Sequence, residues 1–209
     1  MPIIFEKTLN NTKHLVLWEI TESKTFFLDY LSLPVQMINE LNKITHPSKQ
    51  LEWLASRSCV KYLLNKEKIP FTGLLKDEHN NPHFENNQFK VSITHSHQYA
   101  AAVMDSINEV GIDIEQKSDK LLKVANKFLN NQEYKFAQNN VEILCKIWCA
   151  KESLYKLYGK RNLSFKENIS IKDFHKDDTS IEGKIIEENS QKNYSINIYN
   201  FNDFILTVV

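Results

Sequence analysis

The 209-residue chain has 26 Lys and Arg against 26 Asp and Glu, and 42% of its residues are hydrophobic. That apolar content is sufficient for a folded core, whereas the balanced charge gives no support to a nucleic-acid or membrane-surface partner. No apolar run approaches the ~18 residues of a membrane span. Three cysteines, and a start without a basic region leading into a long apolar segment, indicate a reducing compartment. We therefore expect a cytoplasmic protein, and a monomer.

The spacing of apolar residues predicts an α+β chain, because helical and strand-like segments come in groups. The predicted elements, in chain order, are a strand over 14–20, helices over 21–30, 34–44 and 48–65, strands over 89–94, 99–104 and 110–115, helices over 119–129, 131–137 and 141–158, and strands over 169–174, 180–187, 194–201 and 204–209. Gly159 is expected to end the longest helix of the second half.

The two long predicted helices share one sequence pattern. Trp53–Lys61 and Trp148–Lys156 both read W-x-A-x-x-S-x-x-K, and the two tryptophans are 95 positions apart. The same offset aligns the strand around Trp18 with the strand around Asp113. We infer a tandem duplication.

The boundary of this duplication is predicted near 105–109, which gives two subdomains, 1–105 and 106–209. Each is expected to consist of a small antiparallel sheet packed on one long helix. Arg57 occupies in the first half the place that Glu152 has in the second. The first half is therefore expected to bind anions, and the second to bind a cation.

Two carboxylates are set into the apolar run Val110–Glu115. Asp113 and Glu115 alternate with Ile112 and Ile114, so in a strand they share one face with their bases roughly 6–7 Å apart. Two acids at this separation favour a hard cation such as Mg²⁺. The alternative is a half-exposed edge strand with two solvated acids.

A third carboxylate lies on the long helix 141–158. Glu152 and Lys156 are four residues apart and so lie on one helix face, where they could also form an ordinary surface ion pair. Together with Asp113 and Glu115, they indicate metal-assisted phosphoryl or phosphodiester chemistry.

The segments Gly111–Glu115 and Trp148–Lys156 resemble the paired signature of the 4′-phosphopantetheinyl transferases, G-[IV]-D-[IV]-E followed by W-x-x-K-E-[AS]-x-x-K. Length and duplication resemble the Sfp-type branch, a single-chain pseudo-dimer of two α+β halves related by pseudo-two-fold symmetry with the site between them. The resemblance implies transfer of the 4′-phosphopantetheine arm of coenzyme A to a serine of an apo carrier protein, with release of 3′,5′-ADP.

The resemblance also implies roles for the residues of the second half. Asp113, Glu115 and Glu152 match the positions that hold Mg²⁺, with Mn²⁺ as the alternative ion. Glu152 is the candidate acceptor of the serine proton. Lys156 matches a catalytic lysine on the phosphates, and Lys151 is implied as a supporting charge nearby.

In the first half, the resemblance places His95 on a coenzyme A phosphate, as a catalytic and binding residue, and Arg57 on the 3′-phosphate. Lys61 either assists Arg57 or is solvated. The family commonly has a basic residue before the proline that precedes the histidine strand, whereas this chain has Asn81 before Pro82. Pro82 is kept as a binding position, and His83 either replaces the basic residue or the contact is absent.

A lysine stripe follows the acidic strand, and it either meets an acidic carrier protein or is a solvated face; it consists of Lys117, Lys120, Lys123 and Lys127. Two other functions remain open at this point. A metal-dependent phosphodiesterase or nuclease would use the same three carboxylates, and a non-catalytic carrier-binding module would keep the surface alone. The sequence does not choose among fatty-acid, polyketide and peptide-synthesis carriers.

Overall fold

The structure is a computed structural model that describes residues 3–86, 88–160 and 162–209. The chain divides into two compact units, of which the first ends at Val110 and the second runs from Gly111 to Val209. This division lies five residues beyond the boundary at 105 that the repeat predicts. Within the described residues, no helix is both long and apolar enough to cross a membrane.

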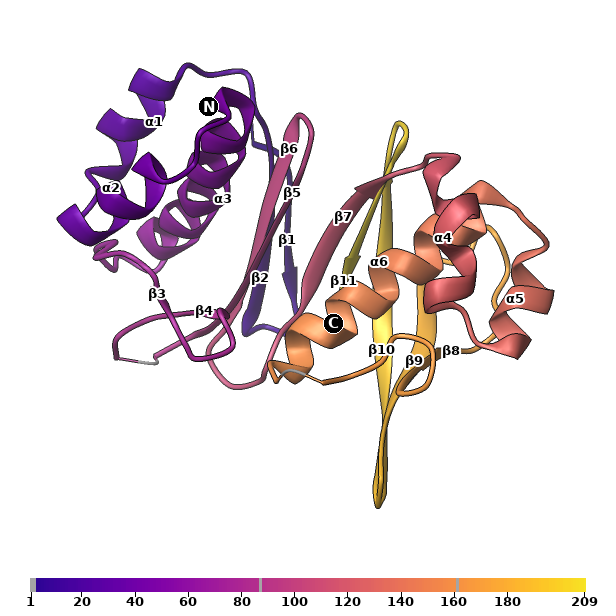
Figure 1. Cartoon of the computed structure of the whole chain (residues 1–209). Helices are drawn as coiled ribbons and strands as arrows, with labels where there is room; N and C mark the ends of the chain where they lie inside the picture. The colour runs from indigo at the N-terminus through magenta and orange to yellow at the C-terminus, as the bar shows by residue number, and fades with distance from the viewer. Residues whose placement is uncertain (1–2, 87, 161) are drawn as a thin grey trace. The chain divides into compact units, whose positions relative to one another are not determined.

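The N-terminal unit has a four-stranded antiparallel sheet in the order β1-β2-β6-β5, and helix α3 packs on β2, β5 and β6 (Figure 1). Its elements are β1 (Ile3–Leu9), β2 (Lys13–Glu19), α1 (Lys24–Leu31), α2 (Val35–Asn42), α3 (Pro47–Lys66), β3 (Leu75–Lys76), β4 (Pro82–His83), β5 (Lys90–Ser96) and β6 (Tyr99–Asp105). The side chain of Ser23 caps α1 by accepting the N–H of Phe26. The core lies between α3 and the sheet and includes Trp18 and Leu54, both fully buried.

The C-terminal unit has a five-stranded antiparallel sheet in the order β7-β11-β10-β9-β8, and α6 packs against β7, β11, β8 and β9. Its elements are β7 (Ile112–Gln116), α4 (Lys120–Phe128), α5 (Asn131–Ala137), α6 (Val141–Tyr158), β8 (Ile169–Ile171), β9 (Ser180–Glu187), β10 (Ser190–Phe201) and β11 (Phe204–Val208). Asn140 caps the start of α6, and Gly159 ends it in the left-handed conformation, as the sequence predicts.

The two units share part of their topology, which is what a duplication predicts. In each, one strand (β2 or β7) is followed by three helices, by two further strands and then by an antiparallel pair, and the strand orders β2-β6-β5 and β7-β11-β10 correspond. The N-terminal unit adds β1 before β2, and β3 and β4 form a separate small sheet, whereas β8 and β9 belong to the main sheet. The sequence pattern does not predict β1, β3 or β4, and it makes β8 too long and β10 too short. Symmetry between the two units stays a prediction.

Candidate active site

The acidic strand β7 lies unusually close to helix α6 at Gly111. A β-carbon at this position would stand 1.8 Å from the carbonyl oxygen of Ser153 and 2.8 Å from the amide nitrogen of Leu157. No side chain fits there, so glycine allows the backbone of the strand to approach the helix. The approach places Asp113, two residues further along, beside the face of α6 that carries Glu152 and Lys156.

Asp113 and Lys156 form a half-buried ion pair. The Lys156 Nζ lies 2.9 Å from Asp113 Oδ1 and also donates to the carbonyl oxygen of Ile112 at 2.9 Å. Asp113 is 7% exposed. An ammonium group has three protons, and these two contacts use two of them. Counting the hydrogen bonds of the described residues, Lys156 has one proton left for a further acceptor.

The pKa of Glu152 is raised to about 7, chiefly because burial disfavours the charged carboxylate. The negative charge of Asp113 raises it further, the positive charge of Lys156 lowers it in part, and Glu115 raises it again. Asp113 and Glu115 therefore both interact electrostatically with Glu152. Glu115 is half-buried, and its Oε1 also accepts the N–H of Gln116 at 2.8 Å.

The donor set of Asp113, Glu115 and Glu152 consists of carboxylate oxygens alone, which is the chemistry that Mg²⁺ and Mn²⁺ prefer. A divalent cation would also offset the mutual repulsion that raises the pKa of Glu152. In the part of the chain that the structure describes, no three His, Cys, Asp or Glu side chains are already grouped as a metal site. The fit to a metal therefore rests on the donors and their electrostatics.

Lys151 differs from the expectation that it supports a phosphate. Its side chain is fully buried, and Nζ donates to Glu133 and to the carbonyl oxygens of Phe128, Phe165 and Ile169 at 2.6–2.8 Å. Four acceptors surround three protons, so this ammonium has none to offer a ligand. Burial lowers the pKa of Lys151, while the charge of Glu133 and its hydrogen bond raise it. The structure thus gives Lys151 an internal role and corrects its assignment as a coenzyme A contact.

Arg57, on α3, is a buried cation. It is 6% exposed, and its Nη1 donates to the carbonyl oxygen of Trp53 at 3.3 Å and to Ser56 Oγ at 3.0 Å, while the guanidinium lies 4.1 Å above the Trp53 ring. Its Nε is buried without a hydrogen-bond partner. Burial lowers the pKa of Arg57 to about 10, partly offset by the charge of Glu40, so the group stays protonated at neutral pH. No described carboxylate forms an ion pair with it, which suits an incoming anion.

The other predicted contacts of the N-terminal unit are arranged differently. Lys61 Nζ donates to the carbonyl oxygen of Tyr30 at 2.6 Å and to that of Leu31 at 3.4 Å, so it caps the C-terminus of α1 instead of supporting Arg57. Pro82 and His83 form β4, and the buried Nδ1 of His83 has no hydrogen-bond partner among the described residues. His83 therefore has a ring nitrogen that remains available for a hydrogen bond, whereas Pro82 forms part of the short strand β4.

His95, near the end of β5, is oriented by an acid that the sequence pattern does not single out. Its Nδ1 lies 2.7 Å from Glu52 Oε2, and Glu52 is buried on α3, where Lys49 Nζ lies at 2.7 Å from the same oxygen. A carboxylate beside one ring nitrogen fixes the orientation of the imidazole ring. The 95-residue offset aligns Glu52 with Ile147. An acid at a position where the other half has an apolar residue is the feature of the sequence that could have indicated a role for Glu52.

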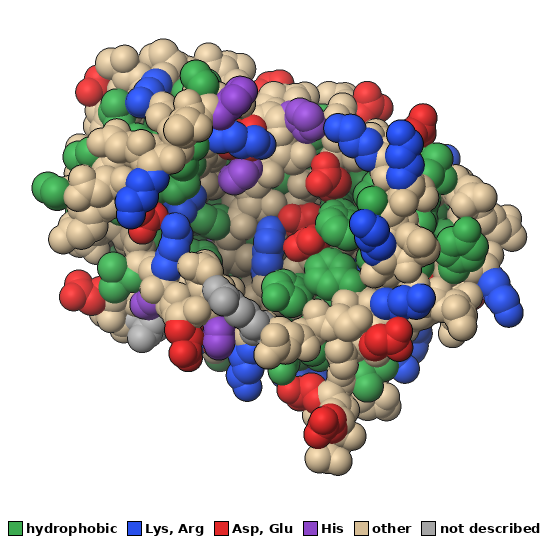
Figure 2. Space-filling view, in the orientation of Figure 1, with side chains coloured by type: hydrophobic (Ala, Val, Ile, Leu, Met, Phe, Trp, Pro, Cys, Tyr) green, Lys and Arg blue, Asp and Glu red, His purple; other side chains and the backbone are tan. Residues whose placement is uncertain are grey.

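The lysine stripe lies along α4. Lys120, Lys123 and Lys127 are exposed, whereas Leu121 and Phe128 are buried against α6. Figure 2 shows Lys and Arg side chains over the part of the C-terminal unit where Figure 1 places α4. The helix thus presents a basic face to solvent. Lys117 precedes the helix, is half-buried, and donates its N–H to the carbonyl oxygen of Asp203.

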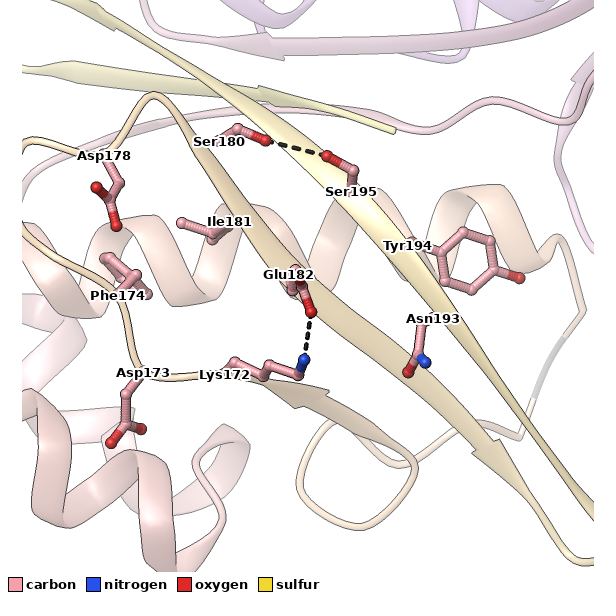
Figure 3. A pocket seen from close by; sticks show the side chains of 10 residues that line it. All are labelled: Lys172, Asp173, Phe174, Asp178, Ser180, Ile181, Glu182, Asn193, Tyr194 and Ser195. Atoms are coloured by element: carbon pink, nitrogen blue, oxygen red, sulfur yellow. Dashed lines mark hydrogen bonds and ion pairs between the residues drawn. The ribbon is translucent and has the colours of Figure 1, made fainter.

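A cavity of about 540 Å³ lies elsewhere in the C-terminal unit, beside β9 and β10 (Figure 3). Its polar side chains bond one another, since Lys172 pairs with Glu182 and Ser180 with Ser195. None of the three carboxylates or Lys156 lines it. The cavity is therefore separate from the residues that the sequence singles out.

The fold and the acidic cluster agree with the comparisons to known proteins. Residues 109–209 match the family model of the 4′-phosphopantetheinyl transferase superfamily, and residues 39–105 match that of the 4′-phosphopantetheinyl transferase N-terminal domain. These segments make up most of the chain, and the chain belongs to the 4′-phosphopantetheinyl transferase superfamily. The resemblance of the two motifs is confirmed, and the presence of both domains is consistent with the Sfp-type branch.

A particular relative is the 4′-phosphopantetheinyl transferase gsp of Aneurinibacillus migulanus, which is 34% identical over 107 residues. The match covers 48% of this chain and 44% of the relative, so it spans less than half the length of that protein.

Proposed function

We propose that this protein transfers the 4′-phosphopantetheine arm of coenzyme A to a serine hydroxyl of an apo acyl or peptidyl carrier protein and releases 3′,5′-ADP. Family membership supports the reaction class. The observation that carries the proposal is the site at β7 and α6, where the half-buried Glu152 interacts with Asp113 and Glu115 beside Lys156. A phosphoryl-transfer site needs these charges of both signs next to one another.

In this mechanism, Glu152 accepts the proton of the serine hydroxyl. The serine oxygen forms a bond to the β-phosphorus of coenzyme A, and the bond from that phosphorus to the bridging oxygen breaks, so that 3′,5′-ADP leaves with the electron pair. A carboxyl whose pKa is about 7 is well matched to general-base catalysis near neutral pH. Lys156 donates a hydrogen bond to a phosphate oxygen with its remaining N–H, while the ion pair with Asp113 holds the Lys156 ammonium in place.

Asp113, Glu115 and Glu152 would hold the divalent cation, which we propose to be Mg²⁺, with Mn²⁺ as the substitute. When bound, such an ion neutralises charge on the pyrophosphate and its leaving oxygen. The protein's own contribution is to hold three carboxylates and one lysine on two rigid elements. It thereby positions the reacting groups and limits the entropy lost on the way to the transition state.

We propose that Arg57 and His95 bind phosphate groups of coenzyme A. Arg57 offers a buried guanidinium whose Nε has no hydrogen-bond partner among the described residues, and the 3′-phosphate is the anion that suits it. His95, whose Nδ1 lies beside Glu52, is proposed to bind a phosphate oxygen through its imidazole ring. His83 is proposed to take the place of the missing basic residue before Pro82. The basic face of α4 is proposed to meet the acidic carrier protein.

Mass spectrometry of apo carrier proteins incubated with coenzyme A, Mg²⁺ and this protein tests the proposal. A panel of fatty-acid, polyketide and peptide-synthesis carriers distinguishes which class of carrier this protein modifies. The expected product is a carrier with one phosphopantetheine added at serine, together with 3′,5′-ADP. Hydrolysis of coenzyme A without transfer would favour a phosphodiesterase, and carrier binding without reaction would favour a non-catalytic module. A cytoplasmic monomer stays a prediction, which gel filtration and cell fractionation would test.

A further inference from the structure

The buried ammonium of Lys151 holds together segments that are far apart in the sequence. Its acceptors are Phe128, the last residue of α4, Phe165 in the loop after α6, Ile169 at the start of β8, and Glu133 of α5. The longest of these contacts is 2.8 Å. A single side chain of α6 therefore fixes the helix to four neighbouring segments of the C-terminal unit.

Glu133 completes this arrangement from the other side. It is 1% exposed; one carboxylate oxygen accepts from Lys151 at 2.6 Å and from the N–H of Asn130 at 2.8 Å, and the other accepts the N–H of Ile171 at 2.8 Å. Both charges are thus saturated with hydrogen bonds inside the protein. We name these two residues, Lys151 and Glu133, the buried pair.

The buried pair adjoins the proposed catalytic acid in the sequence. Lys151 precedes Glu152, and Ser153 follows it with a second internal attachment, since its Oγ donates to the carbonyl oxygen of Thr207 at 3.1 Å and lies 2.7 Å from Thr207 Oγ1. Thr207 is the register partner of Asp113 in the sheet. Successive helix residues point about 100° apart, so attachments on both sides of Glu152 fix the rotation of α6 about its axis.

Burying two charges is costly, and well-packed apolar residues often stabilise a protein as well or better. An ion pair with this many directed hydrogen bonds instead defines one orientation of the groups that it joins. We propose that the buried pair positions Glu152 toward Asp113, so that Lys151 acts on the site through α6 and not by contact with coenzyme A. The inference rests on the proposed function of the carboxylate cluster.

The main test compares the wild-type protein with Lys151→Met in a titration of Mn²⁺ followed by electron paramagnetic resonance, below the unfolding temperature of each. Loss of a residue that positions a metal ligand typically weakens metal binding 10–100-fold. We expect Lys151→Met to bind Mn²⁺ at least about tenfold more weakly and to lose kcat by a similar factor, with the KM for coenzyme A within about twofold of wild type.

Lys146→Met is the matched control. Lys146 also lies on α6, is 1% exposed, and donates to the carbonyl oxygen of Lys176, so its loss removes an equally buried lysine without touching the buried pair. Its Mn²⁺ affinity is expected to stay within about twofold of wild type. An equal loss of Mn²⁺ affinity in both variants would overturn the inference, because removal of any buried lysine of α6 would then have the same effect.

Glu133→Asp is a milder variant that keeps the charge and shortens the side chain by one methylene. It keeps the test decisive if Lys151→Met does not fold, and it is expected to weaken Mn²⁺ binding at least about threefold. The double variant Lys151→Met with Glu133→Gln is expected to lose no more than Lys151→Met alone, because two residues that act as a unit are not additive.

Two results would overturn the positioning role. One is wild-type Mn²⁺ affinity in folded Lys151→Met or Glu133→Asp; the other is a rise in the dissociation constant for coenzyme A without any change in Mn²⁺ affinity, which would make Lys151 a ligand contact. A failure of the transferase function itself would appear in wild-type protein, as absence of carrier modification. The two failures are therefore distinguishable.

Discussion

Helices α3 and α6 carry the same nine-residue pattern but use it for opposite charges. At equivalent positions α3 has Arg57 and α6 has Glu152, and each is the charged residue for which we propose a role in its unit. The equivalent lysines also differ, because Lys61 caps the carbonyl end of α1, whereas Lys156 pairs with Asp113. A duplicated frame thus keeps its packing while the polar residues on it diverge.

The neighbouring strands explain how this divergence is accommodated. Gly111 in the C-terminal unit is equivalent to Val16 in the N-terminal unit, and Asp113 is equivalent to Trp18. Trp18 and Val16 are core residues of β2. Where an acid has to meet the long helix, the strand needs a glycine to come close. In the N-terminal unit, the large apolar side chain of Trp18 takes the place of Asp113, and the strand does not need a glycine.

The largest effect is expected from Glu152→Gln, which removes the proton acceptor and one carboxylate of the cluster. We expect kcat to fall about 10³-fold, within the range for loss of a general base. Arg57→Met is the matching change in the other helix and is expected to leave kcat nearly unaltered. Equal losses of kcat in the two variants would contradict the division of roles, and phosphopantetheine transfer followed by mass spectrometry provides the measurement.

The same Glu152→Gln variant is expected to be more stable than wild type without metal at pH 8. Folding raises the pKa of Glu152 from an ordinary 4.5 to about 7. Between these values the folded state binds more protons than the unfolded state, so stability falls as pH rises, and the penalty is complete above pH 7. It amounts to about 3 kcal/mol at most, and Gln does not carry it. Denaturant titrations should show a small difference at pH 5, about 1 kcal/mol, and nearly the full difference at pH 8.

Gly111→Ala is expected to destabilise the C-terminal unit by about 3 kcal/mol or more, because the new methyl group meets backbone atoms that cannot move independently. Gly183→Ala is the control. A β-carbon there would meet the side-chain ends of Ile171, Ile196 and Leu154 at 2.8–2.9 Å, which can shift. Denaturant unfolding of both variants tests the contrast, and a larger loss at Gly183 would contradict the account of the close approach.

The sequence predicts the second half of the fold better than the first, for local reasons. The strand with Asp113 alternates apolar and polar residues, and helix α6 has an Asn cap and a terminal glycine; these signals all act within a few residues. β1 has little apolar alternation, and half-buried and exposed positions follow one another along it. β3 and β4 are two residues each and depend on their pairing, which no local pattern encodes.

Among the proposed site residues, the placement of the carboxylates follows from local patterns, whereas the surroundings of two buried charges do not. Strand alternation places Asp113 and Glu115 on one face, and helical spacing places Glu152 beside Lys156. The carbonyl oxygens around Lys151 come from segments 14 to 23 residues away, so its internal role appears only in the folded chain. Glu52 was missed because it adjoins Trp53 in a helix whose repeat pattern starts one residue later.

Arg57→Met is expected to raise the KM for coenzyme A about 10–100-fold, as for loss of a charge-assisted bidentate contact. The sharper measurement uses coenzyme A that lacks the 3′-phosphate as a second substrate. Wild type should discriminate against it by a similar factor, and Arg57→Met should hardly distinguish the two. If Arg57→Met still discriminates between the two substrates as strongly as wild type, another residue binds the 3′-phosphate and Arg57 has a different role.

The smallest effect is expected from Glu52→Gln, which keeps the size of the side chain but removes the charge that orients His95. We expect a rise of about three- to tenfold in the KM for coenzyme A, less than for His95→Ala, because a positioning partner contributes less than the group it holds. Lys49→Met is the control, since Lys49 contacts the same carboxylate from the exposed side. Steady-state kinetics with coenzyme A as the varied substrate separates the cases: Glu52→Gln should raise KM with little change in kcat, whereas Lys49→Met should leave KM within about twofold of wild type. An equal rise in KM for Lys49→Met would mean that any disturbance of this carboxylate has the same effect, and that its charge beside His95 has no special role.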